Sequence, residues 1–355
     1  MKPVTVASIE PSSVDAGAVA HYGDPSREQK ILDTEAGLVD RSHRDVLAVP
    51  GADRLTWLHS LTTQHLTGLP PMTGSELLVL SPHGHVEHHA VLVDDGTTTW
   101  LDLEPGAGAG LLTFLERMRF MMRVEPADVT ADRAVLSIVG PQTDEALRAL
   151  GVGPLQAADV VPVPPAKFAT GTVPDRPTAR YAAATLPGFD GLVRRVEGGA
   201  DLLVPRAAVA DVIAAAALPP AGIWAYEAMR VAARRPRFGF ETDHKTLPAE
   251  VGWTARAVHL EKGCYRGQET VSRVHHLGRP PRRLALLHLD GITTDELPAP
   301  HTEVVKDGRA VGFVGTAVRH YELGQIALAV LRQNVRPDDG GQLQVGPSTA
   351  AIDPL

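Results

Sequence analysis

Along the first 150 residues, the spacing of apolar positions changes between the period of a helix and that of a strand. Leu55, Leu58 and Leu61 recur at a spacing that is typical of one face of a helix. Ser81-Pro82-His83-Gly84 separates two short apolar runs and predicts a hairpin. The predicted elements are a helix over residues 53–66, strands over 76–80 and 85–93, a helix over 108–119, a strand over 135–139 and a helix over 143–150. Strands and helices mixed in this way indicate an α+β fold class with a mixed sheet.

The remainder of the chain predicts a second α+β part and then a part made of strands. Residues 151–178 are rich in proline and predict irregular connecting structure. The predicted elements after them are strands over 181–186, 192–196 and 201–204, a helix over 206–218, and strands over 283–289, 303–306, 310–316 and 325–331. The last group of strands is short and separated by glycine, aspartate and proline, which predicts a small C-terminal β-barrel.

This pattern divides the chain into four parts. Residues 1–20 contain Pro3, Pro11 and Gly17 with little periodicity, and we expect a flexible leader there. Residues 21–150 and 151–280 are expected to form the first and second α+β parts, and residues 281–355 the barrel. A chain of 355 residues is also longer than one hydrophobic core usually supports.

Composition and charge exclude several classes of protein. The net charge of −8 argues against a general nucleic-acid binder, so direct nucleic-acid binding is not expected. A single cysteine cannot form an intrachain disulfide bond, which fits a reducing compartment. No apolar stretch is long enough for a membrane helix, and residues 1–10 lack the apolar core of a signal peptide. We therefore expect a cytoplasmic protein without a membrane segment.

The single cysteine lies in the octapeptide Lys262-Gly263-Cys264-Tyr265-Arg266-Gly267-Gln268-Glu269. A thiol reacts as its thiolate, and neighbouring cations such as Lys262 and Arg266 favour that form. Cys264 is therefore a candidate reactive group. The alternative is that Cys264 is a small buried apolar residue, because free cysteine is among the most buried residue types.

The octapeptide resembles the hallmark of the folate-binding YgfZ family, Lys-Gly-Cys-Tyr-x-Gly-Gln-Glu, at every fixed position. This family is related to the T protein of glycine cleavage, an aminomethyltransferase. Residues 36–42, 49–53 and 140–142 are similar to segments of both groups. Residues 226–230, 236–239 and 246–250 resemble a helix, a turn and a Leu-Pro-x-Glu segment of the YgfZ family. The resemblance spans about residues 20–335, although only the cysteine motif separates YgfZ from the wider family.

The resemblance implies a three-domain, aminomethyltransferase-like folate-binding fold with a C-terminal β-barrel and tetrahydrofolate, or a derivative, as ligand. It makes Cys264 the essential group, assisted by Lys262 and Tyr265. The remaining motif residues would shape the site and contact the ligand, and they are Gly267, Gln268 and Glu269. Gly263 and Gly267 would allow a close approach of the backbone.

Two residues outside the motif are also candidates for folate contact. Glu197 aligns with the glutamate that binds the pterin ring in T proteins, and a carboxylate can accept two parallel hydrogen bonds from such a ring. The alternative for Glu197 is an exposed glutamate in a turn. Arg230 matches an arginine at the end of a family helix, and it would contact folate or a neighbouring carboxylate. Its alternative is an ion pair on the helix surface.

One departure from the T protein bears directly on chemistry. Where aminomethyltransferases carry Gly-Gly-x-x-Asp-Asp, this chain has Gly84-His85-Val86-Glu87-His88-His89, so the aspartate pair is missing. Glu87 or a histidine could take over the role of acid or base. The alternation of histidine and glutamate over residues 83–89 also raises the alternative of a metal site, but alternation describes any exposed strand face, and we assign no metal ligands.

The resemblance favours a folate-binding protein that supports the assembly or repair of iron–sulfur proteins, with those proteins or their assembly factors as partners. One cysteine cannot hold a four-cysteine cluster, so any cluster contact would be transient or shared. The alternatives are a folate-dependent transferase of aminomethyl or methyl groups, a factor for tRNA modification, and a structural scaffold. Whether the protein catalyses a reaction is left open.

Overall fold

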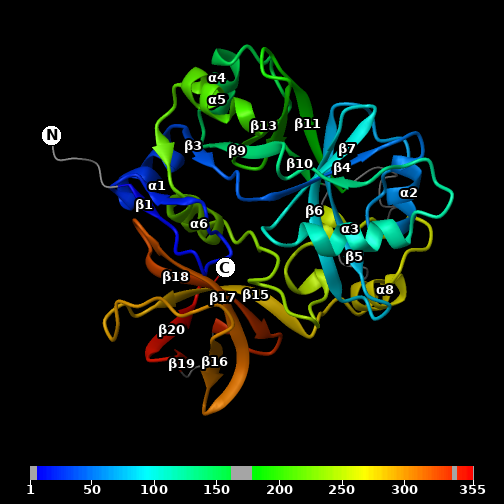
Figure 1. The fold of residues 1–355 in the computed structure, drawn as a ribbon. Coiled ribbons are helices and arrows are strands. Elements are labelled where there is room, and N and C mark those ends of the chain that lie inside the picture. Colours follow the sequence, from blue (N-terminus) through cyan, green and yellow to red (C-terminus); the bar gives the residue numbers. More distant parts are fainter. Residues whose placement is uncertain (1–5, 161–177, 338–341, 355) are drawn as a thin grey trace.

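In the computed structural model, a long mixed sheet lies beside a closed β-barrel, and helices cover the faces of the sheet (Figure 1). The structure describes residues 6–160, 178–337 and 342–354. The predicted proline-rich connection over 151–178 lies largely outside these ranges. No helix in the described ranges is long and apolar enough to cross a membrane. The fold class predicted from the sequence is confirmed, including the barrel.

One half of the long sheet, the first half-sheet, comes from a single continuous stretch of chain. Its strands, in spatial order, are β5 (Thr73–Leu80), β6 (Val86–Asp94), β7 (Thr98–Leu103), β4 (Asp45–Pro50) and β8 (Ala127–Asp128). Two helices, α2 (Arg54–Leu61) and α3 (Gly108–Arg117), bury apolar side chains such as Trp57, Leu111 and Leu115 in its core. The first half-sheet therefore has a hydrophobic core of its own.

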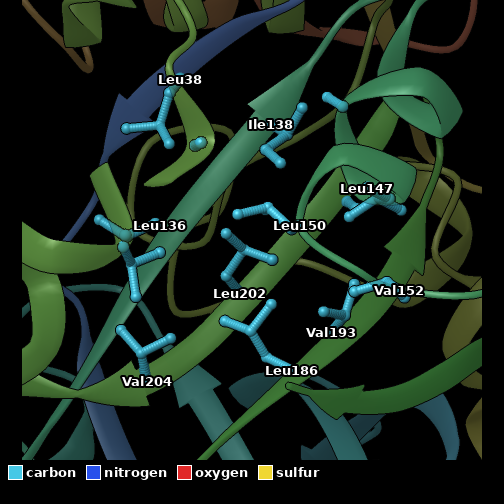
Figure 2. Packing of buried hydrophobic residues seen from close by; sticks show 14 of the residues in the cluster. Leu38, Leu136, Ile138, Leu147, Leu150, Val152, Leu186, Val193, Leu202 and Val204 are labelled. Atoms are coloured by element: carbon cyan, nitrogen blue, oxygen red, sulfur yellow. The ribbon is translucent and has the colours of Figure 1, made fainter. Parts of the chain in front are cut away.

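The other half of the sheet, the second half-sheet, gathers strands from distant parts of the sequence. Its order is β14 (Pro220–Ala221), β3 (Gly37–Asp40), β9 (Arg133–Val139), β13 (Gly199–Pro205), β12 (Gly191–Val196) and β11 (Ala179–Leu186), with β10 (Asp159–Val160) beside β11. The helices on it are α4 (Thr143–Ala149), the 3₁₀ turn η2 (Arg206–Ala208) and α5 (Val209–Ala216). Leu136, Leu147 and Leu202 belong to one buried core, which Figure 2 shows. Tyr181 and Ala182 of β11 pair with β5 and join the two halves.

Two helices connect the sheet to the barrel. These are α1 (Pro25–Thr34) and α6 (Ile223–Ala232). Ala225 of α6 packs with Leu32 and Val39 on the sheet side, whereas Ala228 and Val231 pack against the barrel. Because α6 has apolar residues on both of these sides, it fixes the barrel against the sheet.

The barrel closes in the order β15, β18, β17, β16, β19, β20. The strands are β15 (Arg282–Leu289), β16 (Glu303–Lys306), β17 (Arg309–His320), β18 (Gly324–Arg332), β19 (Leu343–Val345) and β20 (Ser348–Ile352). The first four were predicted from the sequence, whereas β19 and β20 were not, because they are short and lie between glycines and prolines.

The segment between α6 and the barrel contains the cysteine motif and little regular structure. Its elements are η3 (Pro248–Glu250), α7 (Thr254–Ala257) and α8 (Gln268–Leu277). Trp253, Tyr265 and Val271 pack together against Leu78 and Leu80 of β5. The motif is therefore attached to β5, the strand of the first half-sheet that pairs with the second half, and α8 is well separated from α6 in Figure 1.

The structure differs from the sequence-based expectation in three places. Of the expected flexible leader, residues 6–20 are described, and they include β1 (Ala7–Ser8), part of β2 (Val19–His21) and the buried Asp15. The helix expected over 53–66 ends at Leu61. The next residue, Thr62, is no longer helical, and its carbonyl oxygen accepts a hydrogen bond from Lys262. The hydrophobic cores divide the α+β region between β8 and β9, since β9 packs with β12 and β13, and the expected domain boundary at residue 150 stays a prediction.

Candidate functional site

A central pocket lies where the two halves of the sheet, α6 and the segment before α7 meet. It holds about 880 Å³ of empty space, counting its open mouth. Ionisable and aromatic side chains dominate its lining, which includes Asp15, Arg41, His43, Arg44, Glu76, His89, Asp102, Glu104, Tyr181, Glu197, Asp201, Tyr226, Glu227, Arg230, Arg235, Arg237, Trp253 and Arg256. Such a density of buried charge is uncommon outside functional sites.

Buried ion pairs in and next to the strands lie along one side of the pocket. Arg44 contacts Asp102 at 3.0 Å and Glu104 at 2.6 Å. Arg194, which lies behind the lining, bridges Asp102 at 2.6 Å and Asp201 at 2.7 Å. Every carboxylate in this row has a guanidinium partner, so the row is a rigid, mutually compensated surface.

Arg237 connects this row to the N-terminal segment. It contacts both carboxylate oxygens of Asp15, one of them at 2.8 Å, and also bonds to Glu104. Burial favours the neutral form of Asp15, but hydrogen bonds from His43 and Arg237 hold its pKa well below the usual range. The same balance of burial against the charges of Arg44 and Arg237 holds the pKa of Glu104 low. The carboxylates therefore remain ionised, and Arg237 is the shared partner of both.

Arg230, which the sequence predicts to contact folate, is bound by protein groups in the structure. Its guanidinium contacts Glu227 at 2.8 Å and Glu241 at 3.3 Å, and donates to the Thr316 hydroxyl of the barrel at 2.6 Å. Arg230 lines the pocket and is buried. It joins α6 to the barrel, and its direct contact with a ligand stays a prediction.

Glu197 lies in the turn between β12 and β13 and lines the pocket, and its contact with a pterin ring stays a prediction. Its side chain is 38% exposed, and one carboxylate oxygen accepts a hydrogen bond from Arg256. Arg235 donates to the backbone carbonyl of Glu197 at 3.0 Å. Glu197 is thus oriented from two sides, and within the described part of the chain its second carboxylate oxygen accepts no hydrogen bond.

Glu76, His89 and Trp253 form a compact group on the same wall. His89 Nε2 lies 3.0 Å from Glu76 Oε2, and the Tyr181 hydroxyl donates to Glu76 Oε1. The His89 ring stacks on Trp253 with ring centroids 4.5 Å apart and planes 9° apart. Burial opposes ionisation of Glu76, but its hydrogen bond and attraction to His89, with Arg256 nearby, lower its pKa to about 2.

The motif residues that the sequence predicts to be catalytic do not line the central pocket. Cys264 is exposed and does not belong to the pocket lining. Lys262 is buried, and its ammonium donates to the carbonyl oxygens of Thr62 at 2.7 Å and Gln64 at 3.0 Å, and to that of His59. Burial lowers the pKa of Lys262 to about 7. The expectation that Lys262 activates the thiol is therefore not matched by its orientation, since its amine binds carbonyl oxygens of the chain after α2.

The other motif residues pack around that anchor. Tyr265 is buried, and burial raises the pKa of its hydroxyl above the usual range. Gly267 precedes α8 with φ +81°, and a Cβ there would lie 2.6 Å from the Ser81 carbonyl oxygen. Gln268 donates to the carbonyl of Lys262 at 3.1 Å, whereas Glu269 is exposed. Arg266 forms a surface ion pair with Glu87 at 2.8 Å.

The rings of His83 and His85 lie with centroids 6.1 Å apart, but Glu87 and His89 of the same hairpin have other partners. Glu87 pairs with Arg266, whereas His89 binds Glu76. Within the described ranges, no group of three or more His, Cys, Asp and Glu side chains lies close enough to hold a metal ion.

Several pocket residues were not singled out from the sequence. Glu76 could have been found from the sequence, because a glutamate within an apolar strand is unusual. The structure shows that this strand is buried at every position. Asp15 carried no such signal, since its partner Arg237 is 222 residues away. For His89 the sequence indicates only a possible acid or base within an alternating run of histidine and glutamate.

Comparisons with known proteins agree with the architecture. No protein-family model matches the chain. An aminomethyltransferase of Moorella thermoacetica is 27% identical over 337 residues, covering 91% of this chain and 86% of that protein. A chloroplastic protein of Arabidopsis thaliana described as a transferase is 24% identical over 83% of this chain, which spans only 65% of that relative's length.

The crystal structure of aminomethyltransferase T of the glycine cleavage system from Bartonella henselae superposes with a TM-score of 0.77. The superposition covers 99% of this chain and 93% of that chain at 16% identity, so the two share a fold. These similarities support the wider group of aminomethyltransferase-like proteins, and the assignment to the YgfZ branch stays a prediction from the motif.

Proposed function

We propose that this protein binds a reduced folate, tetrahydrofolate or a derivative, in the central pocket and acts as a folate-dependent transferase of one-carbon groups. The observation that carries the proposal is Glu197, whose carboxylate stands at the pocket on a turn fixed by Arg256 and Arg235. The similarity to aminomethyltransferases supports the same ligand class.

The pocket offers the kinds of chemical group that such a ligand requires. The second carboxylate oxygen of Glu197 can accept a hydrogen bond from an amino or ring N–H group of a pterin. Trp253 and Tyr226 supply aromatic surface, and Arg235 supplies a positive charge for the carboxylates of the folate tail.

Binding of 5-formyltetrahydrofolate, measured by isothermal titration calorimetry, tests this proposal. Glu197→Gln keeps the shape of the side chain but removes its charge, and we expect affinity to fall at least about tenfold, as for loss of a charged hydrogen bond. Glu269→Gln is the matched control, because Glu269 is exposed on the motif and outside the pocket lining. Weaker binding in Glu269→Gln with normal binding in Glu197→Gln would move the folate site to the motif.

The transferase activity is tested by turnover of an aminomethyl or methyl donor in the presence of tetrahydrofolate. Formation of a one-carbon derivative of tetrahydrofolate, dependent on both the protein and the donor, would support it. Tight folate binding without any such turnover over a range of donors would reduce the proposal to a folate-binding protein.

A second candidate function rests on Cys264. The thiol is exposed, and the preceding residues are held by the buried Lys262, so a reactive group is presented on an anchored loop. This arrangement favours contact with another protein, and it supports the role in the assembly or repair of iron–sulfur proteins. The test is the activity of an iron–sulfur enzyme in cells that lack this protein and receive either wild type or Cys264→Ala at equal level. Equal rescue by both would remove the thiol from the mechanism.

A further inference from the structure

Glu76 and His89 are brought together by the register of the hairpin that β5 and β6 form. In this register Leu78 is the direct partner of His89, so Glu76 is its diagonal neighbour on the same face. The side chains meet at 3.0 Å on the pocket wall, and their exposed fractions are only 12% for His89 and 9% for Glu76. The pair is therefore shielded from bulk water but faces the space that a ligand would occupy.

The surroundings of Glu76 determine which ring nitrogen of His89 is available. Glu76 is ionised, because its pKa is low and both of its oxygens accept hydrogen bonds, from His89 and from Tyr181. An ionised carboxylate can only accept, so Nε2 of His89 carries a proton toward it. Nδ1 is then the ring atom that can release or take up a proton from a ligand.

Trp253 fixes the plane of the imidazole. The two rings are nearly parallel, with planes 9° apart, and Trp253 is itself buried at 1% exposure. A histidine held by a carboxylate at one nitrogen and by an aromatic ring on one face cannot reorient without breaking both contacts. This is the arrangement in which a histidine transfers protons efficiently, with a carboxylate partner that sets its orientation.

We infer that His89 is the general acid and base of the central pocket, with Glu76 as the residue that positions it. This inference rests on the proposed function, because the ligand is taken to be a one-carbon derivative of a reduced folate. It assigns to a histidine and a glutamate the proton transfer for which the aspartate pair is missing from residues 84–89.

The step can be written for a methylene group that bridges two amine nitrogens of a reduced folate. Protonated His89 gives the Nδ1 proton to one nitrogen as the bond from that nitrogen to the methylene carbon breaks, and the nitrogen keeps the electron pair. The other nitrogen uses its lone pair to form a double bond to the carbon. A nucleophile, which is water or an amine or thiol of the second substrate, then adds to the carbon and returns a proton to neutral His89.

Four ionisable groups line the pocket around His89. Glu76 on β5 is its hydrogen-bond partner, and Arg256 of α7 lies 3.8 Å from Glu76 and is itself paired with Glu197 in the turn after β12. Tyr181 on β11 donates to the other oxygen of Glu76.

The test measures bond cleavage and binding separately. Exchange of carbon-13 formaldehyde into 5,10-methylenetetrahydrofolate, followed by nuclear magnetic resonance, reports breaking and re-forming of the bond with water as nucleophile. We expect wild type to accelerate exchange above the rate in buffer, and His89→Gln to lose about 10²- to 10⁴-fold of that acceleration. Affinity for 5-formyltetrahydrofolate should change less than about threefold in His89→Gln, and this retained binding also shows that the variant is folded.

Glu76→Gln and His88→Gln complete the set. Glu76→Gln keeps the size of the side chain but removes its negative charge. The protonated ring of His89 then loses stabilisation, so the fall in rate that accompanies loss of the catalytic proton should occur at lower pH. His88 is adjacent in sequence but points to the other face of β6, toward Phe114, and His88→Gln should behave as wild type.

The outcomes separate this inference from the proposed function. Absence of folate binding in wild type would overturn both. Folate binding with no acceleration, or an acceleration that His89→Gln retains, would overturn the role of His89 and leave the folate site intact. An unchanged pH–rate profile in Glu76→Gln would remove the positioning role of Glu76.

Discussion

The central pocket and the motif loop, which we define as residues 262–267, place their charged groups in opposite ways. In the pocket, guanidinium and carboxylate groups from distant segments are buried and paired with one another, as in the contacts of Arg237 with Asp15 and Glu104. In the motif loop, the buried charge of Lys262 faces carbonyl oxygens, and the ion pair of Arg266 lies on the surface. The motif is a continuous stretch of sequence that carries an exposed thiol. The pocket, in contrast, is formed by residues that are far apart in the sequence and meet only in the folded chain.

The largest effect that this comparison predicts is at Arg237. Arg237→Met should lower the free energy of unfolding by about 3–5 kcal/mol, because Asp15 and Glu104 would be left as buried charges without that partner. Denaturant unfolding of the full chain measures the loss. Arg237→Lys is the control, since it keeps the charge but not the fork geometry, and we expect an intermediate loss. A loss below about 1 kcal/mol in Arg237→Met would show that the pocket charges are not interdependent.

The second effect is at Lys262. Lys262→Met should cost about 2–3 kcal/mol, because carbonyl oxygens of residues 59, 62 and 64 would lose their donor. The loop that presents Cys264 should also loosen, so alkylation of the thiol by iodoacetamide should become faster. Cys264→Ser is the control for stability, and since Cys264 is exposed we expect little change in it. Unchanged stability in Lys262→Met would mean that the lysine does not anchor the loop.

A smaller effect separates the two glycines of the motif. Gly267→Ala should cost about 1–3 kcal/mol, because φ is +81° and the new methyl group would meet the Ser81 carbonyl. Gly263→Ala meets nothing within 4 Å and has no such φ, so its stability should stay close to that of wild type. Thermal unfolding of both variants gives the difference. Equal values would show that contact with the hairpin does not fix the start of α8.

The smallest effect is at the surface pair of the motif loop. Arg266→Ala should change the free energy of unfolding by less than about 1 kcal/mol, because both partners of its ion pair with Glu87 are more than a third exposed. A double-mutant cycle with Glu87→Ala measures the coupling, which should shrink further in high salt. A coupling energy above about 2 kcal/mol would show that this surface pair stabilises the protein as strongly as a buried pair does. The difference between the motif loop and the pocket would then be smaller than we describe.

The elements of the fold were largely readable from the sequence, whereas the site was readable only in part. Apolar periodicity identified strands such as β6 and β9 within a few residues, because each half-buried strand repeats its pattern locally. Glu197 was found through its alignment, and Cys264 through its motif. Asp15 and Arg237 could not be paired, since the contact joins residues 222 positions apart and no local pattern encodes it.

The pairing of Glu76 with His89 shows a further limit. It depends on strand register, and the hairpin contains an irregularity between Val79 and Leu80. Because one extra residue moves every side chain to the other face, the run of histidines over 83–89 could not be assigned to the pocket or to solvent. The orientation of Lys262 has a related limit. Its amine binds carbonyl groups in and just after α2, and the motif alone does not encode these distant partners.

The way in which the long sheet is assembled also determines an order of events during synthesis. All strands of the first half-sheet lie within residues 45–128, so this half and its core can form as soon as that stretch has left the ribosome. β3 precedes it in the chain, yet its partners β9 and β14 are made later. The nascent chain therefore carries β3 as an unpaired strand until residues 133–139 emerge, and during that interval its unpaired backbone groups can promote aggregation.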